Sequence, residues 1–406
     1  MSARSSPAAR KTSSTEPAHR PPTVTPAEIQ NDETLRNHEF PVTRQRIYLA
    51  HAGVCPLPRR VAEAVAQGAE AGARDDQETA VARDFLVETR VAAARLLGAQ
   101  PSEIALVGPT SLALSFIANG LDFRRNTNAV IYFDDYPSNV YPWMTLADRG
   151  VEVRFLNVRR LGELRAAEVL GQVDENTRLV ALASAHFISG WRLELSRLGQ
   201  ALRSQGILFC VDGIQTLGAF PTTVEHVDVL AADAHKWLLG PCAAGILYVR
   251  EAVQDRIAPS VYGWHNLRCP EFVAQEDLTF RNDARRYEAG SANLLGLLGL
   301  RAALDLVAEV GLPAITEDLQ KKRLWLVREL AQRGYEVLAA DAPPANAGGI
   351  TTFHRPGTDL SALHHRLSEA GVVTSLRRDR AGRAYLRLSP HYYNTPAELG
   401  RALELL

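Results

Sequence analysis

A lysine stands in an apolar stretch of the sequence, "ADAHKWLLGPCAAGILYV", which covers residues 232–249. Lys236 has His235 before it and Trp237 after it. A lysine in such surroundings either extends its amine to water or has a task that uses a desolvated amine. Desolvation favours loss of the proton, and the neutral amine is a nucleophile that forms Schiff bases with carbonyl compounds. Taken alone, the stretch also fits a surface lysine at the end of a strand.

A carboxylate and two hydroxyls are spaced to work with this lysine. Asp212 ends the segment "GILFCVD", and Lys236 lies 24 positions later, one predicted strand further on. In open α/β sheets with mostly parallel strands, ligands bind outside the carboxyl ends of the strands. An acid and a lysine at neighbouring strand ends suit pyridoxal phosphate, because the lysine holds the aldehyde as an imine and the carboxylate keeps the pyridine nitrogen protonated. In "GPTSLALSF", Thr110 and Ser111 would open a helix whose free N–H groups and hydroxyls face a phosphate.

The hydrophobic pattern predicts an α/β fold that brings these residues together. The apolar segments "NAVIYFDD", "VEVRFLNV", "TRLVALASAHF", "GILFCVD", "VDVLAAD" and "AGILYV" alternate with helical segments, which indicates a mostly parallel sheet covered by helices on both faces. Long helices and a short α+β ending then predict a second, smaller domain. We expect a disordered tail over 1–25, an N-terminal segment over 26–60 that packs on the small domain, a large cofactor-binding domain over 61–290 and a small C-terminal domain over 291–406.

Composition narrows the class of protein. The 406 residues are 46% hydrophobic and 22% charged, with a formal net charge of −1, which is typical of a globular protein and argues against nucleic acid or an anionic membrane as the main partner. The apolar runs are shorter than the roughly 20 residues of a membrane span. The N-terminal stretch lacks the apolar core of a secretory signal. Four cysteines without a CxxC pair suggest a reducing compartment and no zinc site, so we expect a cytoplasmic protein without a metal.

The order and spacing of the motifs resemble those of the class V aminotransferase family of fold-type I pyridoxal phosphate enzymes. This family includes cysteine desulfurases, cystine C–S lyases, isopenicillin N epimerase-like proteins and kynureninase. The resemblance covers roughly Arg46 to the C-terminus and is strongest in "VDGIQTLGAFP", "VDVLAADAHKWLLGP" and "GILYV". Three further segments, "DDYPSNVYPW", "YEAGSANLLGLLGLRAAL" and "LRLSPHYYNTPAEL", are similar to family segments near the cofactor and the substrate. No GxGxxG or GxxxxGK follows the first strand, so a nucleotide-binding protein is a remote alternative.

The resemblance implies roles for particular side chains. Lys236 would form the imine and later accept the α-proton, Asp212 would pair with the pyridine nitrogen, and Gln215 would bond the ring hydroxyl. Tyr136 would stack on the ring, and Ser291 would reach the phosphate of the partner subunit in a homodimer with shared active sites. The other implied contacts are to the phosphate for Thr110, Ser111 and His235, to cofactor or substrate for His186, and to substrate for His51 and for Arg377, with Arg387 as the alternative. Each also has a plain structural interpretation, such as a helix cap, a core histidine or an exposed loop arginine.

The sequence constrains the type of reaction less than it constrains the identity of the cofactor. Removal of the α-proton from an amino acid held as an external aldimine gives a carbanion that transamination, C–S lysis and epimerisation share. We expect an aminotransferase-like enzyme, with C–S lyase or cysteine desulfurase activity or amino-acid epimerisation as alternatives, and a catalytically silent assembly subunit as the non-enzyme alternative. Family desulfurases carry a mobile thiolate in the C-terminal domain, but all four cysteines here precede Pro270. Cys242, in "GPCAAG", is expected to be a small buried residue, so we expect no persulfide on the chain itself.

Overall fold

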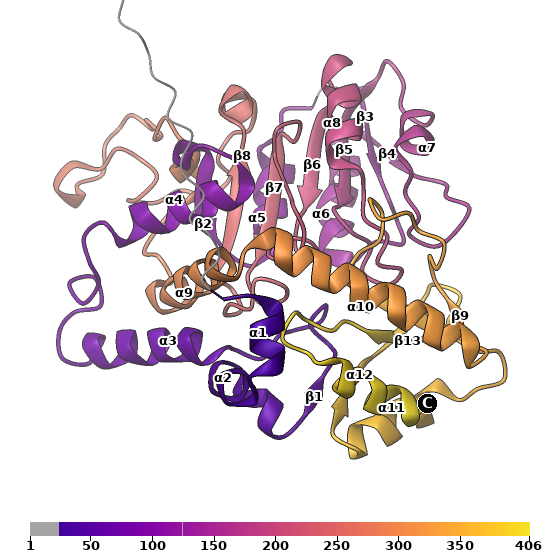
Figure 1. Ribbon diagram of the computed structural model, residues 1–406. Coiled ribbons are helices and arrows are strands. Elements are labelled where there is room, and N and C mark those ends of the chain that lie inside the picture. The colour runs from indigo at the N-terminus through magenta and orange to yellow at the C-terminus, as the bar shows by residue number, and fades with distance from the viewer. Residues whose placement is uncertain (1–23, 124) are drawn as a thin grey trace, which may run out of the picture.

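A seven-stranded sheet forms the centre of the larger part of the molecule (Figure 1). The computed structural model describes residues 24–123 and 125–406. The strand order is β2-β8-β7-β6-β5-β3-β4. The strands are β2 (Ile104–Val107), β3 (Asn128–Ile131), β4 (Glu152–Phe155), β5 (Thr177–Ala183), β6 (Leu208–Asp212), β7 (Val229–Asp233) and β8 (Gly245–Val249). Every pair from β7 to β4 is parallel, whereas β8 runs antiparallel to both β7 and β2. The mostly parallel sheet expected from the sequence is confirmed, with one reversed strand.

Helices cover both faces of this sheet because its central strands carry apolar side chains toward both faces. In β6, Phe209 and Val211 face one core with α8 (Leu195–Ser204), while Leu208 and Cys210 face the other with α5 (Thr110–Gly120). A strand buried on both faces reads as a continuous apolar run rather than as an alternation. The edge strand β4 is less buried than the central strands, since Glu152 is exposed and Phe155 is 47% exposed. The flanking helices are α4 (Phe85–Leu97), α5 (Thr110–Gly120), α6 (Tyr141–Met144), α7 (Ala166–Leu170) and α8 (Leu195–Ser204).

A smaller antiparallel sheet of order β12-β13-β10-β9 lies toward the C-terminus. In Figure 1 the long helix α10 runs between the large sheet and the yellow C-terminal elements. This part contains α9 (Leu294–Val310), α10 (Leu312–Gln332), β9 (Glu336–Val337), β10 (Thr351–His354), α11 (Leu360–Glu369), β11 (Val372–Val373), β12 (Ser375–Arg378), β13 (Ala384–Leu388) and α12 (Pro396–Glu404). Helix α9 packs against α3 (Arg59–Gly72) and α4, so it links the two parts.

The N-terminal segment reaches the C-terminal part through a short parallel pair, in which β1 (Ile47–Tyr48) pairs with β11. It also forms α1 (Pro26–Asn31), α2 (Glu33–Glu39) and α3 (Arg59–Gly72). Short 3-10 turns occur at Pro41–Arg44, Pro101–Glu103, Pro137–Asn139, Thr145–Arg149, Glu251–Arg256, Pro270–Phe272 and Ala284–Tyr287. The domain boundaries stay a prediction, and all but the end of the expected tail lies outside the described residues. Within the described ranges, no helix has the length and apolar character needed to cross a membrane.

A buried ion pair anchors the segment that leads to Ser291. Arg90 of α4 donates to Glu288 Oε2 at 2.5 Å, and the backbone N–H of Leu106 donates to Glu288 Oε1 at 2.8 Å. Both charged side chains are 7% exposed. Removal of one partner of a buried pair leaves the other charge uncompensated, which costs far more than loss of a surface pair. The start of α9 therefore depends on a carboxylate held against α4 and β2.

We expect Glu288→Ala to lower the free energy of unfolding by about 3 kcal/mol or more, because it leaves the Arg90 guanidinium buried without a counter-charge. Urea denaturation of the two proteins, compared at the same protein concentration, measures the change. Glu70→Ala is the matched control, since Glu70 pairs with Arg74 at 3.9 Å on the surface and should cost less than about 1 kcal/mol. Equal effects of the two substitutions would contradict the assigned role of Glu288.

Candidate active site

One cavity of about 250 Å³ lies where the carboxyl ends of β6 and β7 meet β12, β13 and the N-terminal segment. Its wall contains nine of the twelve side chains that the sequence singled out. The lining residues are Ala52, Gly53, Val54, Pro109, Thr110, Ser111, Tyr136, Ser138, Phe187, Asp212, Ile214, Gln215, His235, Lys236, Arg377 and Arg387. The topology thus brings together residues that lie up to 335 positions apart in the sequence (387 − 52).

Lys236 is a buried amine without a counter-ion in contact. It is 6% exposed, as is Lys322, but their environments differ. Lys322 donates to Asp318 and to the carbonyl oxygens of His391 and Tyr392. Lys236 Nζ has no hydrogen bond or ion pair among the described residues and lies 5.1 Å from the centre of the Tyr136 ring. Burial lowers the pKa of Lys236 to about 8, against an opposing effect of the Asp212 charge.

Asp212 faces the same cavity with one oxygen engaged. Its Oδ1 accepts from the Ile214 N–H at 3.0 Å, and no donor in the described part of the chain bonds its Oδ2. Burial raises the pKa of Asp212, whereas the Ile214 N–H and the charges of Lys236 and His235 act to lower it. An acceptor of this kind suits a cationic N–H donor inside the cavity, which would compensate its charge.

Tyr136 and Gln215 are fixed in orientation by neighbouring groups. The Tyr136 ring lies edge to face with Phe187, their centres 5.4 Å apart. The Gln215 amide donates to the Ala52 carbonyl at 3.1 Å, and its oxygen accepts from the Trp237 indole N–H at 2.9 Å. The second amide hydrogen of Gln215 has no acceptor among the described residues, so it remains free for a ligand hydroxyl.

The phosphate-binding residues predicted from the sequence lie at the start of α5. The helix begins at Thr110 as expected, and the backbone N–H groups of Thr110 and Ser111 have no acceptor in the described ranges. The Thr110 hydroxyl accepts from the Asp233 N–H at 2.8 Å, which ties the helix to the end of β7. His235 lines the same end and lies 3.0 Å from Asp233. Free N–H groups at a helix N-terminus favour an anion.

Two predicted histidines lie behind the cavity wall. His51 is fully buried, and its ring nitrogens contact the Ser389 carbonyl at 2.9 Å and the Tyr393 hydroxyl at 2.7 Å. His186 is likewise buried and contacts Ser189 and the Asp134 carbonyl. Burial lowers the pKa of His51 to about 3 and that of His186 to about 4. Both are core histidines with engaged nitrogens, so the structure gives no support to ligand contacts by their rings.

Ser291, the third predicted residue away from the cavity wall, is exposed just ahead of α9. Its expected partner, the phosphate of a second subunit, cannot be reached from within one chain, so this contact stays a prediction.

The sequence did not reveal three residues that shape the site. Asp135 is buried and accepts from the Tyr136 N–H at 2.7 Å and from the Ala183 N–H at 3.2 Å, so it fixes the segment that carries the aromatic ring. Burial and the nearby Asp212 charge raise the pKa of Asp135 to about 7. Phe187 and Gly53 line the cavity without any chemical signature in their residue types. For Asp135, the doubled acid in "DDYPSN" at a strand end was the available signal.

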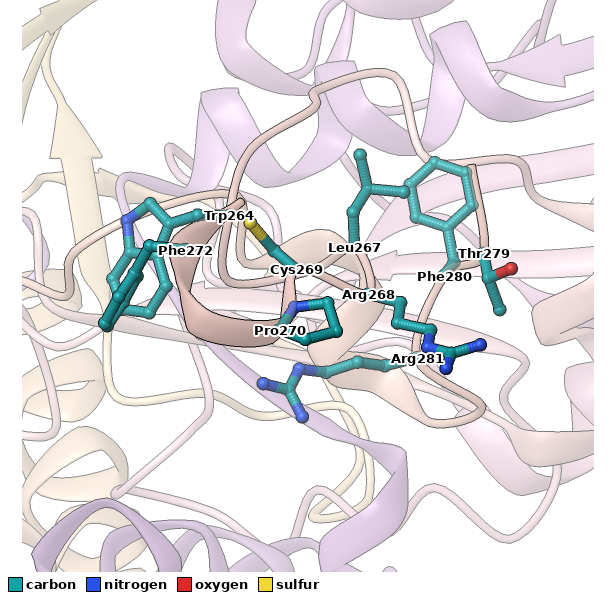
Figure 2. Close-up of a pocket in the computed structure, with 9 residues that line it drawn as sticks. All are labelled: Trp264, Leu267, Arg268, Cys269, Pro270, Phe272, Thr279, Phe280 and Arg281. Carbon is teal, nitrogen blue, oxygen red and sulfur yellow. The ribbon is translucent and has the colours of Figure 1, made fainter. Parts of the chain in front are cut away.

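The cysteines are placed away from this chemistry. None of the four lines the cavity, and Cys55 and Cys210 are buried. Burial raises the pKa of Cys55 to about 12, and partial desolvation together with the nearby Asp233 charge raises that of Cys242. The expectation that Cys242 is buried is wrong, because the "GPCAAG" turn carries its side chain to the surface. Cys269 belongs to a separate hollow, in which Trp264 and Phe272 contact edge to face (Figure 2).

The aminotransferase class-V family model matches residues 47–401. The chain belongs to this family. Pyridoxal 5'-phosphate is its cofactor, and the cavity fits that group: it offers a buried free amine, a carboxylate oxygen without a donor, and open N–H groups at a helix start. The protein is therefore a pyridoxal phosphate-dependent enzyme with the fold-type I architecture expected from its sequence.

Several proteins are similar to this class V chain over most of its length. A probable cysteine desulfurase of Methanothermobacter thermautotrophicus is 28% identical over 390 residues, covering 90% of this chain and 96% of the relative. The apo cysteine desulfurase of Thermococcus onnurineus NA1 superposes with a TM-score of 0.83 at 23% identity, covering 91% and 96% of the two chains. The cystine C–S lyase C-DES, in complex with its reaction product cysteine persulfide, gives a TM-score of 0.81 at 22% identity, covering 90% and 98%. A mutant of C-DES holds glycine covalently linked to the cofactor.

We expect capture of pyridoxal phosphate by the apoenzyme to follow the titration of Lys236. With a pKa near 8, about a tenth of the amine is neutral at pH 7, against fewer than one in about a thousand for an ordinary lysine. The rate of imine formation, followed by absorbance, should rise about tenfold from pH 6 to pH 7 and level off above pH 9. Lys236→Ala should show no imine absorbance. A rate that still rises tenfold between pH 9 and pH 10 would contradict the lowered pKa.

Proposed function

We propose that this enzyme cleaves the C–S bond of a cysteine-type amino acid bound to pyridoxal phosphate at Lys236. The main support is the curated relative described as a probable cysteine desulfurase, which aligns over nearly the full length of both chains. The aminotransferase-like reaction expected from the sequence thereby gives way to its alternative, C–S lyase or desulfurase chemistry. Epimerisation and a silent assembly role have no comparable support.

Several of the cavity residues have a part in the proposed reaction. When bound, pyridoxal phosphate supplies an electron sink for the charge left at the α-carbon. Lys236 would hold its aldehyde and would accept the α-proton at Nζ, for which a pKa of about 8 is well matched. Asp212 would pair with the protonated pyridine nitrogen, and Gln215 would bond the ring hydroxyl. Tyr136 would pack on the ring.

The remaining contacts hold the two anionic ends. The N–H groups of Thr110 and Ser111, with His235, would bind the phosphate. Arg387, which lines the cavity and bonds only the Phe187 carbonyl and the Ser375 hydroxyl among the described residues, would bind the α-carboxylate of the substrate in place of Arg377. Ser291 of a second copy completes the phosphate site in a homodimer, as the sequence resemblance implies. His51 and His186 support the wall from behind, because their ring nitrogens are engaged with other protein groups.

The sulfur leaves as a small molecule in this proposal. A thiol that accepts sulfur must reach the substrate and needs a lowered pKa. No cysteine of the chain lines the cavity, and the pKa values of Cys55, Cys210 and Cys242 are all raised by burial. The favoured outcome is C–S lysis without a persulfide on the protein.

We expect the holoenzyme to form pyruvate and ammonia in equal amounts from a cysteine-type substrate, with sulfur released as a small-molecule persulfide or sulfide. To measure these products, the enzyme is incubated with each amino acid of a panel, and pyruvate, alanine, released sulfur and racemised substrate are assayed in the same reactions. Alanine with released sulfur would indicate desulfuration instead of lysis. Transfer of the amino group to an added 2-oxo acid without sulfur release would contradict the proposal and restore the aminotransferase interpretation.

We expect Cys242→Ala to keep kcat within about twofold of the wild type, because its thiol is exposed outside the cavity and its pKa is raised. Mass spectrometry of the wild type after turnover should find no persulfide on any of the four cysteines. Cys269→Ser serves as the matched control for general effects of losing an accessible thiol. Loss of activity in Cys242→Ala, with a persulfide mapped to Cys242, would make the protein a desulfurase with a relocated thiol.

A further inference from the structure

The backbone turn that follows Lys236 contains an unfavourable conformation. Leu239 has a φ of 60°, in the left-handed region that residues other than glycine rarely adopt. Within the turn, the Leu239 N–H donates to the Lys236 carbonyl at 3.2 Å. A strained turn of this kind persists only when surrounding groups fix it. The contacts of Trp237, the residue next to Lys236, identify those groups.

His391, in the segment between β13 and α12, binds the Trp237 carbonyl. Its side chain is fully buried, and its Nε2 lies 3.0 Å from the Trp237 oxygen. The Tyr392 N–H donates to Nδ1 at 2.9 Å, so Nδ1 is unprotonated and Nε2 carries the ring hydrogen that Trp237 accepts. Burial and the nearby His51 hold the pKa of His391 well below its usual range, so the ring stays neutral.

The Trp237 carbonyl has no alternative partner. No other donor in the described ranges bonds it. On another side it faces Gly218, where an added Cβ atom would lie 2.8 Å from the oxygen. A buried carbonyl is costly to leave unpaired, so it moves toward water or another donor when its donor is lost. Loss of the His391 N–H should therefore let the strained turn relax and carry Lys236 toward solvent.

The same contacts also orient Gln215. The Trp237 indole N–H donates to the Gln215 oxygen at 2.9 Å, and the Gln215 amide donates to the Ala52 carbonyl at 3.1 Å. The Ala52 N–H donates to the hydroxyl of Ser389 at 3.0 Å, and Ser389 lies two positions before His391. These bonds form a closed ring that joins the lysine turn, the N-terminal segment and the C-terminal part of the chain.

We propose that His391 is a positioning residue that holds the turn of Lys236, and through Trp237 the amide of Gln215, in the geometry that the cofactor requires. His391 does not line the cavity, so it acts through these residues rather than on a ligand. The inference rests on the proposed role of Lys236 as the residue that holds pyridoxal phosphate. It makes the C-terminal part of the chain a contributor to cofactor binding.

The rate of imine formation between the apoenzyme and pyridoxal phosphate, measured by absorbance from pH 6 to pH 10, tests the assignment. His391→Met has a side chain of similar length without a donor. In this variant the pH at which the rate levels off should rise by about one unit or more, because a lysine in contact with water approaches its ordinary pKa of about 10.4. The rate at pH 7 should fall about tenfold.

His391→Gln is the matched variant, since it keeps an N–H donor at the end of a side chain of similar length and should restore most of the wild-type profile. The two variants differ from each other chiefly in this donor. Both keep the Tyr136 ring beside the Lys236 amine and the charged groups that act on it, which are Asp212, Arg387, Arg377 and Asp135.

Thr395→Ala controls for general destabilisation of the C-terminal segment. Thr395 caps α12 by accepting the Glu398 N–H and has no bond to Trp237, so its loss should lower the free energy of unfolding in urea and leave the pH profile unchanged. If His391→Met shows no cooperative urea transition, Asn394→Ala replaces it. The Asn394 side chain accepts the His391 N–H at 2.8 Å, so its loss should displace the ring and shift the profile in the same direction.

A profile that matches the wild type in His391→Met, or in Asn394→Ala where that variant replaces it, would overturn the inference. A shift of equal size in His391→Gln or Thr395→Ala would also overturn it. Borohydride labelling of the wild type separates these outcomes from failure of the proposed function. A label on Lys236 with an unmoved profile refutes only the role of His391, whereas a label on another lysine refutes the role of Lys236 itself.

Discussion

Burial of an unpaired amine at Lys236 is the constraint on which the rest of the site depends. An ammonium taken out of water without a counter-ion in contact costs several kcal/mol, and the group lowers this cost by losing its proton. Lys322 is equally buried, but Asp318 and two carbonyl oxygens hold it as a structural cation. The apolar turn after β7 provides Lys236 with no such acceptors. The same residue type therefore serves structure at one place and reactivity at the other.

The cavity combines charges from both parts of the molecule. The large sheet contributes Asp212 and Lys236 at the ends of neighbouring parallel strands, and the small sheet contributes Arg377 and Arg387 from one hairpin. Neither part holds a complete set of binding groups. The contacts that join the parts, namely the β1–β11 pair, α9 against α4 and the Arg380–Asp134 ion pair, thus also fix the distance between the cofactor groups and the substrate groups.

The sequence predicted those residues of the site that stand next to a recognisable strand or motif. Lys236, Asp212 and the start of α5 follow apolar strands, so strand patterning alone located them, and the family resemblance added Gln215 and Tyr136. Residue type alone did not indicate which side chains are buried or already engaged by the protein. His51 and His186 look like ligands by type, yet the small sheet and the loop around Asp134 engage their nitrogens. The exposure of Cys242 depends on a turn with a positive φ at Ala243, which its apolar neighbours concealed. Arg377 and Arg387 share one face of the small sheet because Ser375 lies opposite Arg387 and Arg377 lies opposite Tyr385, a register that residue types do not reveal.

Identification of the lysine that holds the cofactor tests the central claim most directly. The chain has only four lysines, Lys11, Lys236, Lys321 and Lys322, so borohydride reduction of the holoenzyme followed by peptide mass spectrometry can distinguish them cleanly. The account predicts a single pyridoxyl label on the peptide that contains Lys236. A label on Lys322, the other buried lysine, or on either of the remaining two would contradict it.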